Sequence, residues 1–166
     1  KGHLYLLKAF KTVVNDFHDM QLKIYGHGLP QEKQQVADEV IRLKLEKNVV
    51  LGDFVTHASE LIGGASLLLV PSQAHESFGL TIIEAMALGV PVVTTDVGGM
   101  PEVLGDTNSG FVCSKDDPYE FASAIKDILG NPLLASEQGY NGRVTFERRF
   151  MASVMAGRYA ELVKDD

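Results

Sequence analysis

Short apolar runs alternate along this chain with segments whose apolar residues recur every three or four positions. Runs of four or five apolar residues are typical of strands covered on both faces, and the longer spacing is typical of amphipathic helices. This alternation predicts βαβ crossovers. The expected fold is therefore a doubly wound α/β fold, in which a mainly parallel sheet carries helices on both faces.

Turn and cap signals set the approximate limits of these elements. Pro30 fits a first helical turn, Ser59 is predicted to cap a short helix, and Asp117 precedes a proline that can start another. The predicted strands are 21–25, 48–51, 66–70, 91–94 and 110–113. The predicted helices are 4–17, 30–43, 59–62, a segment from about 80, 117–128 and two segments near the C-terminus.

Length and charge narrow the class of protein. A chain of 166 residues without a repeat or linker is expected to form one domain, 1–166. A formal net charge of -7 argues against a surface that tracks nucleic acid, because such affinity comes from accumulated Lys and Arg. No apolar run approaches the roughly 20 residues of a membrane span. The lone Cys113 cannot close an internal disulfide, which favours the cytoplasm.

The loops that follow the predicted strands are the places to look for a ligand. In doubly wound sheets, ligands bind at the carboxyl ends of the strands. These loops are 26–30, 54–59, 71–80 and 95–101. The third is the most informative, because it carries Glu76, leads into a helix at about Leu80, and places Glu84 one turn further on.

The chemistry of this loop suits a ligand with alternating sugars and phosphates. The first turn of a helix leaves unbonded N–H groups and a partial positive charge, so Gly79, Leu80 and Thr81 can cradle a phosphate. The carboxylate of Glu84 can accept two hydrogen bonds from a vicinal diol such as a ribose, and Glu76 can do the same for a second polyol. The pattern predicts a nucleotide sugar as ligand.

Plainer interpretations stand beside this one. Taken singly, Glu84 is equally well a solvated charge on a surface helix and Glu76 a loop acid. His75 could be a proton donor near the ligand, but a loop histidine beside a glutamate is more often just a hydrogen-bonded neighbour. A glycosidase with paired carboxylates lacks a clear group to activate water. A dinucleotide fingerprint begins at Gly26, but Gln31 stands where its third glycine belongs, so an oxidoreductase is disfavoured.

Taken together, the motifs resemble one family. Residues 71–72, 76–80, 84–87, 89, 91–93, 98–99 and 102 read Pro-Ser, Glu-Ser-Phe-Gly-Leu, Glu-Ala-Met-Ala, Gly, Pro-Val-Val, Gly-Gly and Glu. In this order they resemble the C-terminal domain of retaining GT-B glycosyltransferases of family four, the "group 1" glycosyltransferases. Further landmarks resemble it at 1–2, 25–28, 50–52, 110–112 and 146–150, so the resemblance covers nearly the whole chain.

The resemblance implies roles for the two glutamates. Glu84 would bind the ribose hydroxyls of the nucleotide, and Glu76 would bind hydroxyls of the transferred sugar at the catalytic centre. The implied reaction transfers a sugar from a nucleotide diphosphate sugar to an acceptor with retention at the anomeric carbon. The fold it implies is the Rossmann-like, donor-binding half of a GT-B enzyme.

The resemblance also implies how the diphosphate is held. Backbone amides at Phe78, Gly79 and Leu80 would meet the donor sugar and the diphosphate. Lys1 would neutralise the diphosphate in place of a metal ion, so no metal or other cofactor is expected. The sequence shows no cluster of metal-ligating residues, which agrees with the metal independence of the family.

One departure from the family pattern concerns the start of the domain. Relatives have a strand ending in Gly-Arg upstream of the Lys-Gly, and this first strand and its arginine are absent here. The acceptor-binding N-terminal domain is absent as well. Three outcomes are open for the sheet: the neighbouring strands close the gap, another chain fills it, or the fragment is less stable. The fragment is expected to be inactive alone and to keep weak donor binding.

Two other functions remain open at this stage. The chain could be half of a GT-B nucleotide-sugar epimerase, or a non-catalytic module that keeps the fold and the nucleotide. Residues 54–57 could contact the base, since they follow a strand. The nucleotide, the sugar, the acceptor and the oligomeric state are not predicted, and membrane association at the cytoplasmic face stays open through the absent half.

Overall fold

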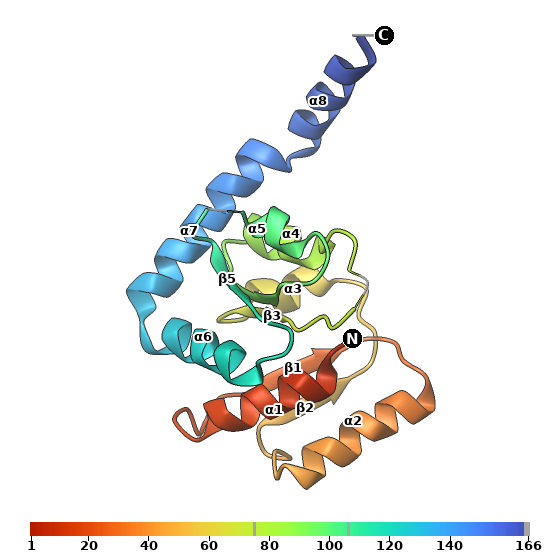
Figure 1. Ribbon diagram of the computed structural model, residues 1–166, viewed down its shortest axis with the longest axis vertical. Coiled ribbons are helices and arrows are strands. Elements are labelled where there is room, and N and C mark those ends of the chain that lie inside the picture. The colour runs from red at the N-terminus through yellow and green to blue at the C-terminus, as the bar shows by residue number, and fades with distance from the viewer. Residues whose placement is uncertain (75, 106, 165–166) are drawn as a thin grey trace.

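The computed structural model describes residues 1–74, 76–105 and 107–164 and alternates strands with helices as predicted (Figure 1). The strands are β1 (Leu22–Tyr25), β2 (Val49–Gly52), β3 (Leu68–Val70), β4 (Val92–Thr95) and β5 (Gly110–Cys113). The helices are α1 (His3–Val14), α2 (Pro30–Arg42), α3 (Ala58–Gly63), α4 (Leu80–Ala87), α5 (Met100–Leu104), α6 (Pro118–Gly130), α7 (Pro132–Arg149) and α8 (Ala152–Lys164).

Every strand pair in the described residues is parallel, which confirms the predicted α/β class. β1 pairs with β2, and Leu22 lies opposite Val49. β4 lies between β3 and β5, with Leu68 opposite Val92 and Val93 opposite Phe111. The connections between paired strands run through helices, as parallel strands require.

The strands form two sheets, β1-β2 and β3-β4-β5, which no ladder of hydrogen bonds joins in the described residues. Of the three outcomes left open for the sheet, pairing of the neighbouring strands across the gap is not seen in the described residues. β1 and β3 each keep one edge without a strand beside it. Within each sheet the strands follow their order along the chain.

Two apolar clusters hold these layers together. The first lies under α1 and α6 and takes side chains from both sheets, Leu22 and Val49 from one and Val93 from the other. The second lies on the other face of the larger sheet, where Ile82 and Met100 of α4 and α5 are buried. Figure 1 shows α1 beside α6, α7 lying along the body, where it contacts α4, and α8 running away from it. The first cluster therefore packs the two sheets against each other.

The limits of the elements follow the predicted signals with two exceptions. Asp117 caps α6 as predicted, since its carboxylate accepts hydrogen bonds from the amides of Tyr119 and Glu120. The predicted cap at Ser59 is wrong, because α3 begins at Ala58 and Ser59 lies inside it. The short helix α5 was not predicted, because two glycines before it indicate only a turn.

Candidate functional site

Two loops meet at the carboxyl edge of the larger sheet. The loop from β3 to α4 carries Glu76, and the loop from β4 to α5 carries Gly98 and Gly99. A Cβ added to Gly98 would lie 1.8 Å from the carbonyl oxygen of Glu76, and one added to Gly99 would lie 2.5 Å from that of Ser77. The Gly99 amide donates to the Glu76 carbonyl at 3.3 Å. The glycine pair thus lets the two loops touch and fixes the backbone of Glu76.

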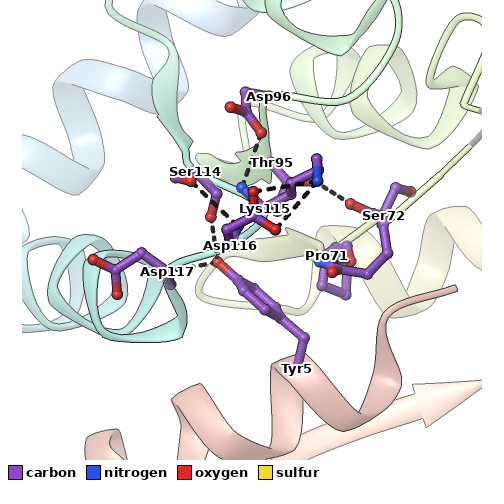
Figure 2. Close-up of polar contacts among 10 residues, drawn as sticks. Tyr5, Pro71, Ser72, Thr95, Asp96, Ser114, Lys115, Asp116 and Asp117 are labelled. Carbon is purple, nitrogen blue, oxygen red and sulfur yellow. Dashed lines mark hydrogen bonds and ion pairs between the residues drawn. The ribbon is translucent and has the colours of Figure 1, made fainter.

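The Glu76 side chain is half-buried, and residues near the ends of β3 and β4 hold it in place. The hydroxyl of buried Ser72 donates to Oε2 of Glu76 at 3.3 Å. The carbonyl of Ser72 in turn accepts a 2.6 Å hydrogen bond from the hydroxyl of Thr95, at the end of β4 (Figure 2). The sheet therefore supports an acidic side chain at its carboxyl edge.

The start of α4 lies directly after this loop and is not capped by a side chain. Gly79 adopts the left-handed conformation with φ 73°, and its carbonyl accepts the amide of Ile82. A Cβ at Gly79 would approach Ile82 Cδ1 to 3.1 Å and Met100 Cγ to 3.3 Å. Among the described residues, no acceptor is found for the amides of Leu80 and Thr81. The first turn of α4 therefore offers donors to a ligand.

Glu84 lies on the exposed face of α4. Leu80 and Thr81, which lie four and three positions before it, are exposed as well, whereas Ile82 and Met86 are completely buried. Residues three and four apart share one face of a helix. Glu84 therefore shares its face with the uncapped first turn, and the apolar residues of α4 pack inward as predicted.

Lys1 is brought to the same edge by the residue that follows it. Gly2 precedes α1 with φ 76°, and a Cβ on it would lie 1.8 Å from the carbonyl oxygen of Pro71. Pro71 is the first residue after β3 and opens the Glu76 loop. Lys1 is exposed there. Burial, together with the positive charges of the chain terminus and Lys1, lowers the pKa of His3.

Phe78 precedes the helix start and is 39% exposed. Its ring packs edge-to-face on Phe150, with the ring centres 6.3 Å apart. This contact ties the Glu76 loop to the end of α7. Seven residues were predicted to bind the donor, and the structure places all of them at one edge of the molecule. They are Lys1, Glu76, Phe78, Gly79, Leu80, Thr81 and Glu84.

A second polar network at this edge was not predicted. The hydroxyl of Tyr5 on α1 reaches the carbonyls of Ser114 and Asp117 at 2.7 and 2.9 Å, and the amide of Lys115 donates to Asp96 at 2.9 Å (Figure 2). Burial, with nearby acidic groups, raises the pKa of Tyr5. In the sequence, Tyr5 reads only as one more residue of an amphipathic helix. The network locks the loop after β5 onto α1.

Two aromatic rings stack at the ends of β1 and β2. His27 and Phe54 lie parallel, with ring centres 4.7 Å apart and an interplanar angle of 6°. Phe54 is 56% exposed. Beside them, Lys33 Nζ lies 2.6 Å from Asp53 Oδ1, and this ion pair lowers the pKa of Asp53. The predicted base-contacting segment 54–57 is therefore open at the ligand edge.

The three remaining predictions concern His75, metal ions and membrane spans. The proposed role of His75 lies outside the described residues. Within the described ranges, no three His, Cys, Asp or Glu residues are grouped so that they could hold a metal ion. No helix of those ranges has the length and apolarity that crossing a bilayer requires.

Comparison with known proteins places the chain in a family. The sequence model described as "Glycosyl transferases group 1" matches residues 1–145. The chain is 29% identical over 155 residues to the capsular polysaccharide biosynthesis glycosyltransferase CapM of Staphylococcus aureus, covering 93% of this chain and 40% of CapM. It is 31% identical over 162 residues to a phosphatidyl-myo-inositol mannosyltransferase of Mycobacterium tuberculosis, covering 95% of this chain and 42% of that protein.

Solved structures agree with this placement. Sucrose-phosphate synthase from Thermosynechococcus elongatus superposes with a TM-score of 0.87 at 28% identity, over 99% of this chain and 42% of its own. Anabaena HepE in complex with UDP shares the fold, with a TM-score of 0.91 at 24% identity, over 100% of this chain and 46% of its own. The chain thus spans less than half the length of these proteins. It belongs to the group 1 glycosyl transferases.

Proposed function

We propose that this chain is the donor-binding half of a retaining glycosyltransferase that transfers a sugar from a nucleotide diphosphate sugar to an acceptor. The observation that carries the proposal is the exposed face of α4, which joins an uncapped helix start to Glu84. The Glu76 loop leads straight into that helix start. A carboxylate, free amides and a second carboxylate therefore follow one another along one edge.

The diphosphate is proposed to lie at the start of α4. Amides of Phe78, Gly79, Leu80 and Thr81 would donate to its oxygens, helped by the partial positive charge of the helix N-terminus. Lys1, held at this edge by the contact of Gly2 with Pro71, would neutralise remaining charge. Preorganised donors of this kind stabilise a leaving diphosphate as the glycosidic bond to it breaks. No metal ion is needed in this scheme.

The two carboxylates are proposed to bind the sugars on either side. Glu84 would accept hydrogen bonds from the ribose hydroxyls. Glu76, held by Ser72, would accept them from the hydroxyls of the sugar that is transferred. The catalytic role of Glu76 would thus be to position the anomeric carbon. The bond from this carbon to the diphosphate breaks and the diphosphate leaves with the bonding electrons, while the acceptor oxygen bonds to the carbon on the same face and gives up its proton to the diphosphate.

The base is proposed to lie near the ends of β1 and β2. The exposed ring of Phe54 offers an apolar surface there. Uridine is the first base to test, because a mutant of the S. aureus protein TarM, 26% identical over 95% of this chain and 32% of TarM, was solved in complex with UDP.

The other half of the enzyme is proposed to bind the acceptor. Proteins such as CapM are more than twice as long as the part that this chain matches. The isolated chain is accordingly expected to bind donor weakly and to transfer no sugar. We propose that the enzyme works in the cytoplasm, which supplies nucleotide sugars and keeps a free thiol such as Cys113 reduced. Membrane association through the other half of the enzyme is compatible with this proposal.

Calorimetric titration with UDP and UDP-glucose tests the two carboxylates separately. Glu84→Ala should weaken both ligands by roughly 10- to 100-fold, because each loses hydrogen bonds to a charged acceptor. Glu76→Ala should weaken UDP-glucose and leave UDP unchanged, because UDP has no hexose. Glu161→Ala, which removes an exposed glutamate from α8, is the matched control. GDP- and ADP-glucose complete the series.

Binding that no longer depends on Glu84, or no binding by any of the three donors, would refute the site. Equal losses for UDP and UDP-glucose in Glu76→Ala would refute the division between ribose and hexose. The full-length protein should release UDP only when an acceptor is present. Interconversion of the free nucleotide sugar without acceptor would show an epimerase instead.

A further inference from the structure

The end of α7 lies against the loop that leads into α4. α7 ends at Arg149, and the ring of the next residue, Phe150, packs edge-to-face on Phe78, with an angle of 81° between the two rings. Along its length, α7 also packs on α4 itself (Figure 1). α7 therefore supports both the end of the Glu76 loop and the helix that follows this loop.

Phe150 has a fixed place in the fold. Together with Phe146, one turn earlier, it packs against the second apolar cluster, which contains Ile82 of α4 and Met100 of α5. Its amide donates to the carbonyl of Phe146 at 2.8 Å and closes the last turn of α7. The ring that meets Phe78 is thus anchored to the core on one face of the larger sheet.

Arg149 attaches the same ring to α5. Its guanidinium lies over the ring of Phe150, 4.9 Å from the ring centre, and its Nη2 donates to the carbonyl of Glu102 at 3.2 Å. A guanidinium is attracted to the face of an aromatic ring. Arg148 occupies the preceding position in the last turn of α7 but is exposed, whereas Arg149 is half-buried. The two arginines carry the same charge and differ in burial.

The segment from Glu76 to Phe78 is held at both ends. The glycine pair of the loop from β4 to α5 approaches the carbonyls of Glu76 and Ser77. At the other end of the segment, Phe150 contacts the ring of Phe78. Gly79 follows directly, adopts the left-handed conformation and precedes the first residue of α4. The direction of the amides of Phe78 and Gly79 therefore depends on where Phe150 holds the ring.

We infer that Phe150 is a positioning residue for diphosphate binding and that Arg149 supports it. The inference rests on the proposed function, in which the amides of Phe78 and Gly79 donate to the diphosphate. The contact between the two rings favours the loop conformation that presents these amides. The apparent affinity of a ligand falls with the fraction of the protein that is competent to bind it, so loss of the ring contact weakens diphosphate binding.

The ring contact sets the size of the expected effect. An edge-to-face aromatic pair is equivalent to a factor of about 2 to 12 in an equilibrium constant. Phe150→Ala should therefore weaken UDP binding in calorimetric titration by up to about 12-fold. Phe150→Tyr keeps the ring and should restore the affinity. If circular dichroism shows that the alanine variant is unfolded, Phe150→Leu takes its place, because leucine keeps most of the apolar volume without the ring.

A double-mutant cycle shows whether Phe150 acts through Phe78. Phe78→Ala removes the partner ring, so Phe150→Ala should cause no further loss of UDP affinity in that background. Arg149→Ala should weaken UDP binding by roughly 2- to 5-fold, because the ring of Phe150 loses the guanidinium that holds it. Arg148→Ala is the matched control, since it removes the same charge from the same turn, and it should leave the affinity unchanged.

The outcomes separate this inference from the proposed function. UDP is replaced by GDP or ADP if titration of the donors shows that the wild type binds one of these instead. Nucleotide binding that is independent of Glu84 refutes the proposed function and this inference with it. Binding that depends on Glu84 overturns the inference alone if loss of the Phe150 ring leaves it unchanged, or if the losses from the two phenylalanines simply add. The same holds if Arg148→Ala weakens binding as much as Arg149→Ala does.

Discussion

Replacing Gly98 by alanine tests whether the glycine pair positions Glu76. Gly98 has φ 60°, a left-handed conformation that costs a residue with a Cβ roughly 1–2 kcal/mol. The new Cβ would also lie 1.8 Å from the carbonyl oxygen of Glu76. Since carbon contacts are ordinarily about 3.5 Å, the Glu76 loop has to move by more than about 1 Å. Strain alone should lower the thermal midpoint by roughly 2–8 °C.

Thermal unfolding and UDP-glucose titration measure the two consequences. Gly98→Ala should unfold earlier and bind UDP-glucose more weakly, while UDP itself is affected less because the loop positions the hexose. Gly157→Ala is the matched control: Gly157 is exposed on α8, and a Cβ there meets nothing within 4 Å. It should stabilise the helix by up to roughly 1 kcal/mol. A Gly98 variant that melts and binds like the wild type would refute the reasoning.

Three further predictions concern the edge and the core. Tyr5→Phe removes the donor to Ser114 and Asp117 and should lower the unfolding free energy by roughly 1 kcal/mol in urea titration; an unchanged midpoint contradicts it. Burial raises the pKa of Cys113 from its ordinary 9.0 to about 12, so the thiol stays protonated in the fold while the unfolded chain ionises. The protonated Cys113 thiol contributes its full stabilisation below about pH 9, and this contribution is lost as the pH rises toward 12. The unfolding free energy of Cys113→Ala, measured by denaturation at each pH, should lack this decrease. Phe54→Ala should weaken UDP binding roughly 2- to 12-fold without changing the melting temperature. If the variant binds UDP as tightly as the wild type, Phe54 does not contact the base.

Local patterns predicted the elements well because each has a local cause. The period of apolar residues, the proline at 30 and the aspartate at 117 all act within a few residues of chain. α5 escaped prediction because Met100, Val103 and Leu104 are buried by packing against the larger sheet and α4, which is a long-range cause. Ser59 was misassigned as a cap because a short helix can begin at either of two neighbouring residues.

The residues of the site could be predicted from their resemblance to a family, but their arrangement could not. Glu76 and Glu84 are recognisable in sequence, whereas the hydrogen bond from Ser72 and the support from Thr95 join residues on different strands. Tyr5 and Ser114 are 109 positions apart. Such contacts depend on how the loops fold over the sheet edge, which no local pattern encodes.

The sequence by itself determined the parallel α/β class, the family and the pair of carboxylates around a helix start, because periodicity and short motifs are local properties. Only the tertiary structure decided that Gly98 lets two loops touch, that Lys1 lies at the edge where Pro71 opens the Glu76 loop, and that β1 and β3 do not pair in the described residues. The physical reason is the same in each case. Contacts between distant segments are set by packing and by backbone hydrogen bonding, and a strand cannot bond to a neighbour that lies too far away.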